Sequence, residues 1–200
     1  MSGTSMAAPH VTGVAALLKA HNPDLKWWEI RNLLLAGGKS EDAFEGKTIV
    51  GKRLDAYGSL TCENKRAFGI MEPKGEVFAQ ITPVGEPVLL QAIHAKCAKP
   101  GGVVKVTVKP GNQVIELKDD GDPNASSNKY DEVAGEGIYG GFFDPAQPGW
   151  YELEYSNAFE DKKMVRFVEA TYYGAAKTTY TWRELTTAAT RLGVDYDNKP

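Results

Sequence analysis

The feature that most constrains the fold is an almost continuous apolar stretch near the N-terminus, at residues 4–20, which small residues precede. Its apolar side chains would cover nearly every side of a helix; they are Met6, Ala7, Val11, Val14, Ala15, Leu17 and Leu18. A helix that is apolar all round has to be enclosed by other elements. The stretch therefore predicts a central, buried helix, with Pro9 in its first two turns, where a missing backbone N–H costs little.

The residues around Ser5 suit a nucleophile at the start of this helix. Gly3 permits a close approach of the backbone, and Ala7 and Ala8 are small enough for the helix behind the hydroxyl to be buried. A serine nucleophile needs a base that takes its proton and donors that hold the oxyanion. The backbone N–H of Ser5, at the positive end of the helix dipole, is one such donor. The alternative is that Ser5 is an ordinary N-cap residue.

Residues 1–13, MSGTSMAAPHVTG, resemble the serine-nucleophile segment of subtilisin-like serine proteases. A second, weaker similarity lies at Gly51–Leu60, which resembles the closing helix of that family, so the resemblance covers roughly the first third of the chain. It implies an endopeptidase that hydrolyses a polypeptide substrate through an acyl-enzyme on Ser5. In this family the triad runs Asp, His, Ser along the chain. We therefore expect a truncated protein whose partner is the missing N-terminal part of the catalytic domain.

Other residues that could complete a catalytic site have simpler interpretations. His10 lies five residues further along the same helix and is expected to be a packed part of the motif. His21 precedes a turn and His94 lies in a strand pattern, which favours ordinary surface or core roles. Asp24 and Asp55 are interpreted as turn and cap residues. The chain alone is therefore predicted to lack the triad base and acid and to be inactive.

A second helix is predicted from Lys26 to Ala36, because 22–24 (Asn-Pro-Asp) breaks the chain before it and Gly37 and Gly38 follow it. Glu29 is placed for a capping box, but a lysine side chain at position 26 cannot accept the reciprocal hydrogen bond. We expect this helix start to be weaker by about 1 kcal/mol than one with Ser or Thr at the cap.

After Arg66 the pattern changes to short runs in which apolar and polar residues alternate. The predicted strands are 77–81, 88–95, 103–109, 113–117, 137–143, 150–155 and 164–172. Short strands in this number favour an antiparallel β-sandwich of immunoglobulin-like or fibronectin-like type. Residues 117–122, 135–139 and 148–153 are also similar to a signature of extracellular sandwich modules.

The predicted fold class is therefore mixed: an α-helical remnant of a subtilisin-like α/β domain, then an immunoglobulin-like β-sandwich. The predicted boundaries are 1–66 for the protease part, 67–75 for a linker containing Pro73, 76–173 for the sandwich, and 174–200 for a tail. A capping box at 181–184 and an apolar face predict a short helix in that tail.

Acidic residues gather in one predicted loop of the sandwich; they are Asp119, Asp120, Asp122, Asp131, Glu132 and Glu136. Calcium favours several oxygen ligands from a flexible loop. Asp and Gly also favour turns through local hydrogen bonds, and no EF-hand spacing is present. We therefore predict no cofactor, with calcium as the alternative, and we assign no metal ligands.

Cys62 and Cys97 flank the predicted linker, and two cysteines are too few for a disulfide-rich scaffold or a four-cysteine zinc site. A secreted protein, which the resemblance implies, would join them, whereas Cys97 on the strand face of Leu89 and Ile93 would otherwise be a buried thiol. Both alternatives are kept.

Composition excludes other classes of function. The net charge is -3, and no basic run with interleaved aromatic residues suggests nucleic acid. No apolar stretch reaches the length of a membrane span. A function of another class remains open: a non-catalytic extracellular module in which the sandwich binds or anchors and the protease remnant is vestigial.

Overall fold

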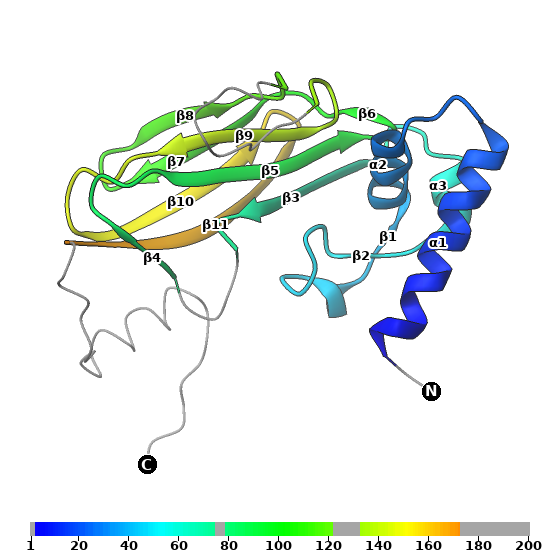
Figure 1. Ribbon diagram of the computed structural model, residues 1–200, viewed down its shortest axis with the longest axis horizontal. Coiled ribbons are helices and arrows are strands. Elements are labelled where there is room, and N and C mark those ends of the chain that lie inside the picture. The colour runs from blue at the N-terminus through cyan, green and yellow to red at the C-terminus, as the bar shows by residue number, and fades with distance from the viewer. Residues whose placement is uncertain (1–2, 75–78, 122–132, 173–200) are drawn as a thin grey trace, which may run out of the picture.

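Helices dominate the first third of the chain and strands the remainder (Figure 1). The computed structural model describes residues 3–74, 79–121 and 133–172. The elements of the first part are α1 Thr4–His21, α2 Trp27–Gly37, β1 Lys39–Ser40, the short 3-10 helix Asp42–Phe44, β2 Lys52–Arg53 and α3 Ala56–Leu60. The strands β1 and β2 form a small antiparallel pair.

Local chemistry explains where these helices start and meet. The backbone N–H of Lys26 donates to the Glu29 carboxylate at 2.7 Å, which is the half of a capping box that the sequence predicts. Asp55 caps α3, as predicted, by accepting from the N–H of Gly58 at 2.8 Å. A Cβ at Gly37 would overlap the backbone of Ser59, so glycine lets α2 and α3 touch.

Nine strands follow in the described residues: β3 Arg66–Glu72, β4 Gln80–Pro83, β5 Val88–Lys96, β6 Lys99–Pro100, β7 Val104–Lys109, β8 Gln113–Leu117, β9 Ile138–Phe143, β10 Gly149–Asn157 and β11 Glu160–Thr171. One sheet has the order β4-β11-β10-β7-β8. The other has the order β3-β5-β6, with β9 also paired to β5. All neighbours are antiparallel except β4 and β11, which run parallel, unlike the sequence prediction.

The two sheets share one apolar core. In β7 the buried Val104, Val106 and Val108 alternate with Lys105 and Lys109, as a sheet with one covered face requires. Opposite them the core takes side chains from the other sheet, which are Phe68, Ile70, Val88, Leu90, Ala92, Tyr139 and Phe143. The immunoglobulin-like type of this arrangement stays a prediction.

The segment predicted as a linker is in large part a strand. Residues 66–72 form β3, and residues 67–70 are buried. Pro73 and Gly75 suggest a linker in the sequence, but Gly69 is required within the strand because a Cβ there would overlap the backbone oxygen of Ile49. The first part of the chain thus leads into the second without a free connection. The predicted tail helix lies outside the described residues.

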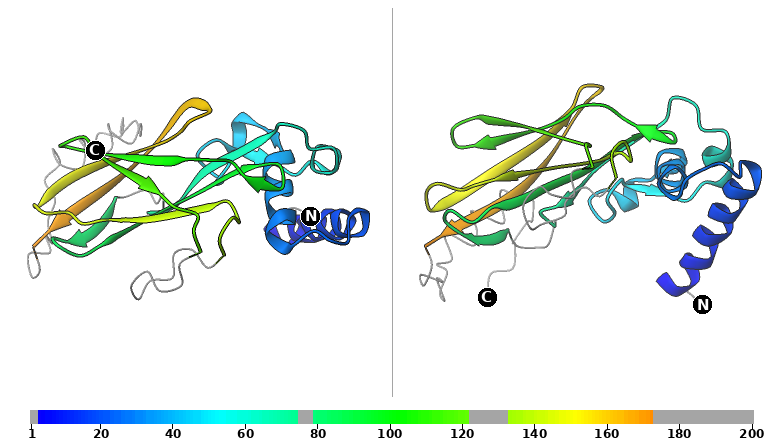
Figure 2. Two further views of the ribbon diagram at one scale, coloured as in Figure 1. Left: turned by 90° about the horizontal axis from the view of Figure 1, so that it is seen from above. Right: turned by 45° about the horizontal axis from the view of Figure 1, so that its top comes forward.

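The buried position expected for the first helix is not observed in this chain. Every residue from 3 to 13 is exposed, and Leu18 is the one buried residue of α1. Met6, Val11 and Leu17 remain more than 40% exposed, at 44%, 42% and 46%. In Figure 2, α1 stands beside the body of the molecule, and α2 and α3 contact it. Within the described part of the chain, nothing encloses this apolar helix.

Candidate active site

Ser5 lies in the first turn of α1, whose N-cap residue is Gly3. The N–H of Met6 donates to the carbonyl of Gly3 at 3.0 Å, which closes that first turn. Backbone N–H groups in a first helical turn have no partner within the helix, so that of Ser5 is available to an oxyanion. The first turn contains no acidic residue that would offset the positive end of the dipole. Helix geometry therefore supplies one donor at the serine.

Pro9 lies in the second turn of α1, within the first two turns predicted. It is the sixth helical residue, and a residue there would normally donate its N–H to the carbonyl four positions back, which is that of Ser5. Proline has no N–H, so that bond cannot form. The carbonyl of the serine is left to other donors.

None of the three histidines is placed as a base for Ser5. His10 lies one turn onward, where Nδ1 is 2.9 Å from the carbonyl of Met6. Five residues correspond to a rotation of roughly 140° about the helix axis, so His10 and Ser5 project from different sides. His21 ends α1, roughly 24 Å along the axis from Ser5. His94 is buried in β5, where its ring meets Phe68 edge-on.

The two aspartates considered above lie in other parts of the fold. Asp24 belongs to the turn after α1, where its N–H donates to the Asn22 side chain at 3.1 Å. Asp55 caps α3. In the described part of the chain, the serine thus has a helix N-terminus but neither the histidine nor the aspartate of a triad.

Two residues of the acidic loop, Asp119 and Glu136, have structural roles. The Asp119 carboxylate accepts from the N–H groups of Gly135, Glu136 and Gly137 at 2.8, 3.1 and 2.9 Å. This is the turn-forming role weighed against calcium. Among the described residues no cluster of three or more metal-ligating side chains occurs, and Asp122, Asp131 and Glu132 lie outside them.

The turn held by Asp119 carries Glu136, which joins the two parts of the chain. Its carboxylate forms an ion pair of 3.0 Å with Arg31 of α2, and the Glu136 side chain is only 5% exposed. Its carbonyl accepts from Arg31 at 2.6 Å and from the fully buried Asn32 at 2.8 Å. Sequence reasoning missed this contact, although an Arg-Asn pair within an apolar helix was a signal for it.

Cys62 and Cys97 form a disulfide, with their Cα atoms 5.6 Å apart. The alternative, a buried free thiol at Cys97, is wrong because Cys97 is in this bond. The alternative assumed that Cys97 continues β5, but that strand ends at Lys96. Cys97 adopts a positive φ of 50°, which takes it out of the alternation of Leu89 and Ile93. A covalent bond therefore also joins the segment after α3 to the sheets.

Comparison with known proteins finds similarity to a protease family in the first part of the chain. The subtilase family, Peptidase_S8, matches residues 1–50. Subtilisin-like protease PopC of Myxococcus xanthus is 58% identical over 36 residues, which is 18% of this chain and 8% of that protein. Subtilisin-like protease 1 of Plasmodium berghei is 53% identical over 60 residues, 30% of this chain and 10% of that protein. The matches thus span about a tenth of these relatives.

Among solved structures, an endo-beta-1,4-mannanase from Thermotoga petrophila is similar to part of this protein, with 17% identity and a TM-score of 0.39. The match covers 59% of this chain and 23% of the mannanase chain. At this score it carries no argument about fold or function. Within residues 3–74, 79–121 and 133–172, no helix is long and apolar enough to cross a bilayer.

Proposed function

We propose that this chain is the C-terminal portion of a subtilisin-like serine endopeptidase and that Ser5 is its nucleophile. In the complete protease, Ser5 attacks the peptide carbonyl, and its backbone N–H is one donor to the oxyanion. The observation that carries the proposal is the coincidence of the subtilase match with the helix N-terminus at which Ser5 lies. The substrate class is polypeptide.

The exposed apolar surface of α1 supports a site that is completed from outside this chain. Met6 and Leu17 lie on one side of the helix, Val11 lies on another, and all three are exposed. Apolar surface of this kind marks a place where another protein surface binds. The proposed partner is the N-terminal part of the catalytic domain, which carries the aspartate and the histidine of the triad.

The disulfide supports secretion. Structural disulfides persist in oxidising compartments and are rare in the cytosol. Cys62 and Cys97 are the only two cysteines, and both are used in the bond. We therefore propose an extracellular protease whose second part is an immunoglobulin-like accessory module.

A second candidate is a non-catalytic binding or anchoring module. It is favoured by the site itself, since neither a histidine nor an aspartate reaches Ser5 within the described residues. The reading frame upstream of the codon for Met1 separates the two candidates. An open frame that encodes an Asp-bearing strand and a His-bearing helix supports the protease; a stop codon or unrelated sequence there supports the module and refutes the protease.

A further inference from the structure

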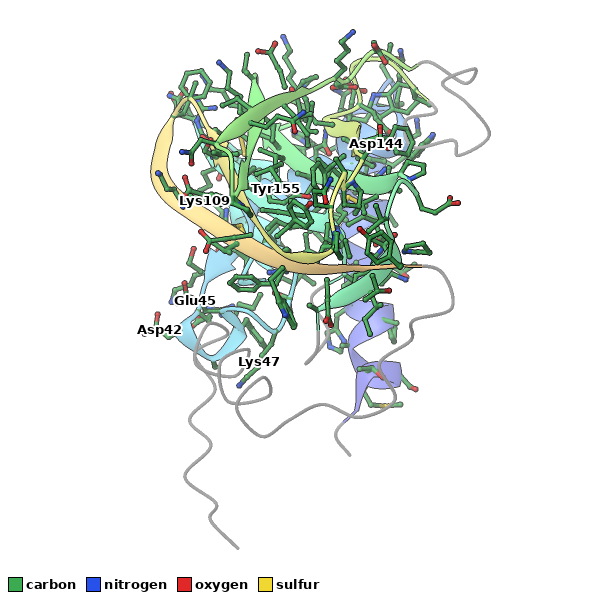
Figure 3. The ribbon with its side chains drawn as sticks, turned by 90° about the vertical axis from the view of Figure 1, so that its left-hand side faces the viewer. Asp42, Glu45, Lys47, Lys109, Asp144 and Tyr155 are labelled. Carbon is green, nitrogen blue, oxygen red and sulfur yellow. A yellow bond between two sulfur atoms is a disulfide. The ribbon has the colours of Figure 1, made fainter. Side chains whose placement is uncertain are left out.

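A pocket of about 530 Å³ lies where the loop between the 3-10 helix and β2 meets β3 and β11. Residues 45, 46 and 48–52 form one wall, and residues 164–166 of β11 form another. Figure 3 shows Glu45 on this peripheral loop, whereas Tyr155 lies among the side chains between the sheets. The pocket shares no residue with the start of α1, so it is separate from Ser5.

Positive charge dominates the lining, because Lys52, Arg66 and Arg166 contribute cations and Glu45 contributes a carboxylate. The Lys52 ammonium donates to the carbonyls of Ala36 and Arg66 at 2.9 and 2.5 Å. The Arg66 guanidinium donates to the carbonyl of Gly101 and lies 3.9 Å from the centre of the Phe159 ring. Among the described residues, no carboxylate forms an ion pair with Arg66 or with Arg166.

Arg166 is the unusual member of this set. One terminal nitrogen donates to the carbonyl of Val165 at 3.0 Å, but Nε is buried and has no acceptor among the described residues. Burial lowers the pKa of Arg166, so its surroundings disfavour the charge. A partly buried cation without an anion is costly, and a bound anion would offset that cost.

Tyr155 interacts electrostatically with Arg166, but it is not an anion that could balance the charge of Arg166. Its hydroxyl donates to the carbonyl of Glu72 at 2.8 Å. Burial also raises the pKa of Tyr155 far above neutrality, so the phenol keeps its proton. The charge of Arg166 is thus left to a ligand from outside.

The rest of the lining selects the class of anion. Ile49, Val50 and Met164 place apolar side chains beside the cations. Such a mixture suits a ligand with one planar charged group and an apolar substituent. A guanidinium pairs with a carboxylate through two parallel hydrogen bonds, so Arg166 favours a carboxylate ligand. The Glu45 carboxylate opposes a more highly charged anion such as phosphate.

We propose that this pocket binds a small organic monocarboxylate with an apolar substituent, its carboxylate paired with Arg166. The site is independent of the proposed protease activity. The test titrates the full chain with N-acetyl-leucine, with the uncharged N-acetyl-leucinamide and with inorganic phosphate. Amide chemical shifts at 45–52 and 164–166 and calorimetry are the readouts.

We expect saturable binding of N-acetyl-leucine with shifts at both walls, and no saturation by the amide or by phosphate. Arg166→Met should weaken binding at least tenfold. Arg53→Met is the matched control, since Arg53 lies outside the pocket and pairs with Glu41 at 2.7 Å; its binding should equal that of the wild type.

Folding of the variants is checked by the melting temperature without ligand. Arg166→Met should leave it unchanged or raise it, because a partly buried charge without an ion-pair partner among the described residues is removed. If that variant does not fold, Arg166→Lys decides, and it should bind more weakly because a lysine lacks the fork of donors. No saturation by N-acetyl-leucine, tighter binding of phosphate, or unchanged binding by a folded position-166 variant would each overturn the proposal.

Discussion

At the residue scale, the contact of Arg31 with Glu136 matters most, because it sets α2 against the sheets. The Arg31 and Glu136 side chains are 23% and 5% exposed. Removal of one partner of such a pair leaves the other charge buried. This pair therefore differs from the many exposed ion pairs of the surface, whose contribution is small.

Arg31→Met should lower the free energy of unfolding by about 3 kcal/mol, because the Glu136 carboxylate loses its cation in a buried place. Denaturant titration measures the change. The control is Lys105→Met, which breaks a 3.8 Å pair with Glu116 whose side chains are 50% and 61% exposed, and it should cost less than about 0.5 kcal/mol. Equal effects of the two variants would contradict the structural role of Glu136.

Two adjacent leucines in α1 test how the helix is covered. Leu17 is 46% exposed and Leu18 is 2% exposed. Leu18→Ala should destabilise the chain by about 2 to 4 kcal/mol, because it leaves a cavity where α1 meets α2 and α3. Leu17→Ala should change stability by less than about 0.5 kcal/mol. A large effect of Leu17→Ala, measured in the same titration, would mean that α1 is enclosed within this chain after all.

At the element scale, most strands could be predicted and β3 could not. The prediction for 113–117 is confirmed by β8 without a shift, because an apolar alternation is bounded there by turn residues. β3 was missed because Pro73 and Gly75 suggest a linker, whereas the need for Gly69 in the strand comes from its contact with the distant Ile49. The start of α1 was predictable from its motif, but its exposure depends on what packs around it. The contact of Arg31 with Glu136 joins residues 105 positions apart, which no local pattern reveals.

The position of β3 changes the expectation for isolated fragments. The alternating strands alone predict that a segment from about residue 75 folds independently. β3 pairs with β5 along 66–72, and Phe68 and Ile70 belong to the shared core. We therefore expect residues 65–200 to melt cooperatively and residues 75–200 to lose at least about 4 kcal/mol or fail to fold, since two buried side chains and a strand partner are removed. Equal melting temperatures for the two fragments would contradict this role of β3.

The disulfide closes a loop with a sequence separation of 35 residues. Replacement of both cysteines by serine should lower the free energy of unfolding by about 3 to 4 kcal/mol, because the unfolded chain regains the entropy of that loop. Thiol titration of the denatured, unreduced protein should find no free thiol. Two free thiols in protein prepared under oxidising conditions would reject the bond.

At the scale of the whole molecule, the two parts are held as one body while α1 remains uncovered. The disulfide, the ion pair of Arg31 with Glu136, and the Lys52 ammonium on the carbonyl of Arg66 all cross between them. The sheets and α2 therefore form one connected body, beside which α1 stands (Figure 1). Under the proposed function, the exposed surface of α1 is the surface that a further protein segment would cover.

The most direct test of this account is the reaction of Ser5 with a fluorophosphonate probe. The chain alone, its Ser5→Ala variant, and the chain fused behind the segment encoded directly upstream are compared by mass spectrometry of the labelled peptide. We predict that the chain alone is labelled no faster than its Ser5→Ala variant, because no base among the described residues reaches the serine. The folded fusion should be labelled on Ser5. Ser5-dependent labelling of the chain alone, or a folded fusion whose Ser5 stays unlabelled, would contradict the account.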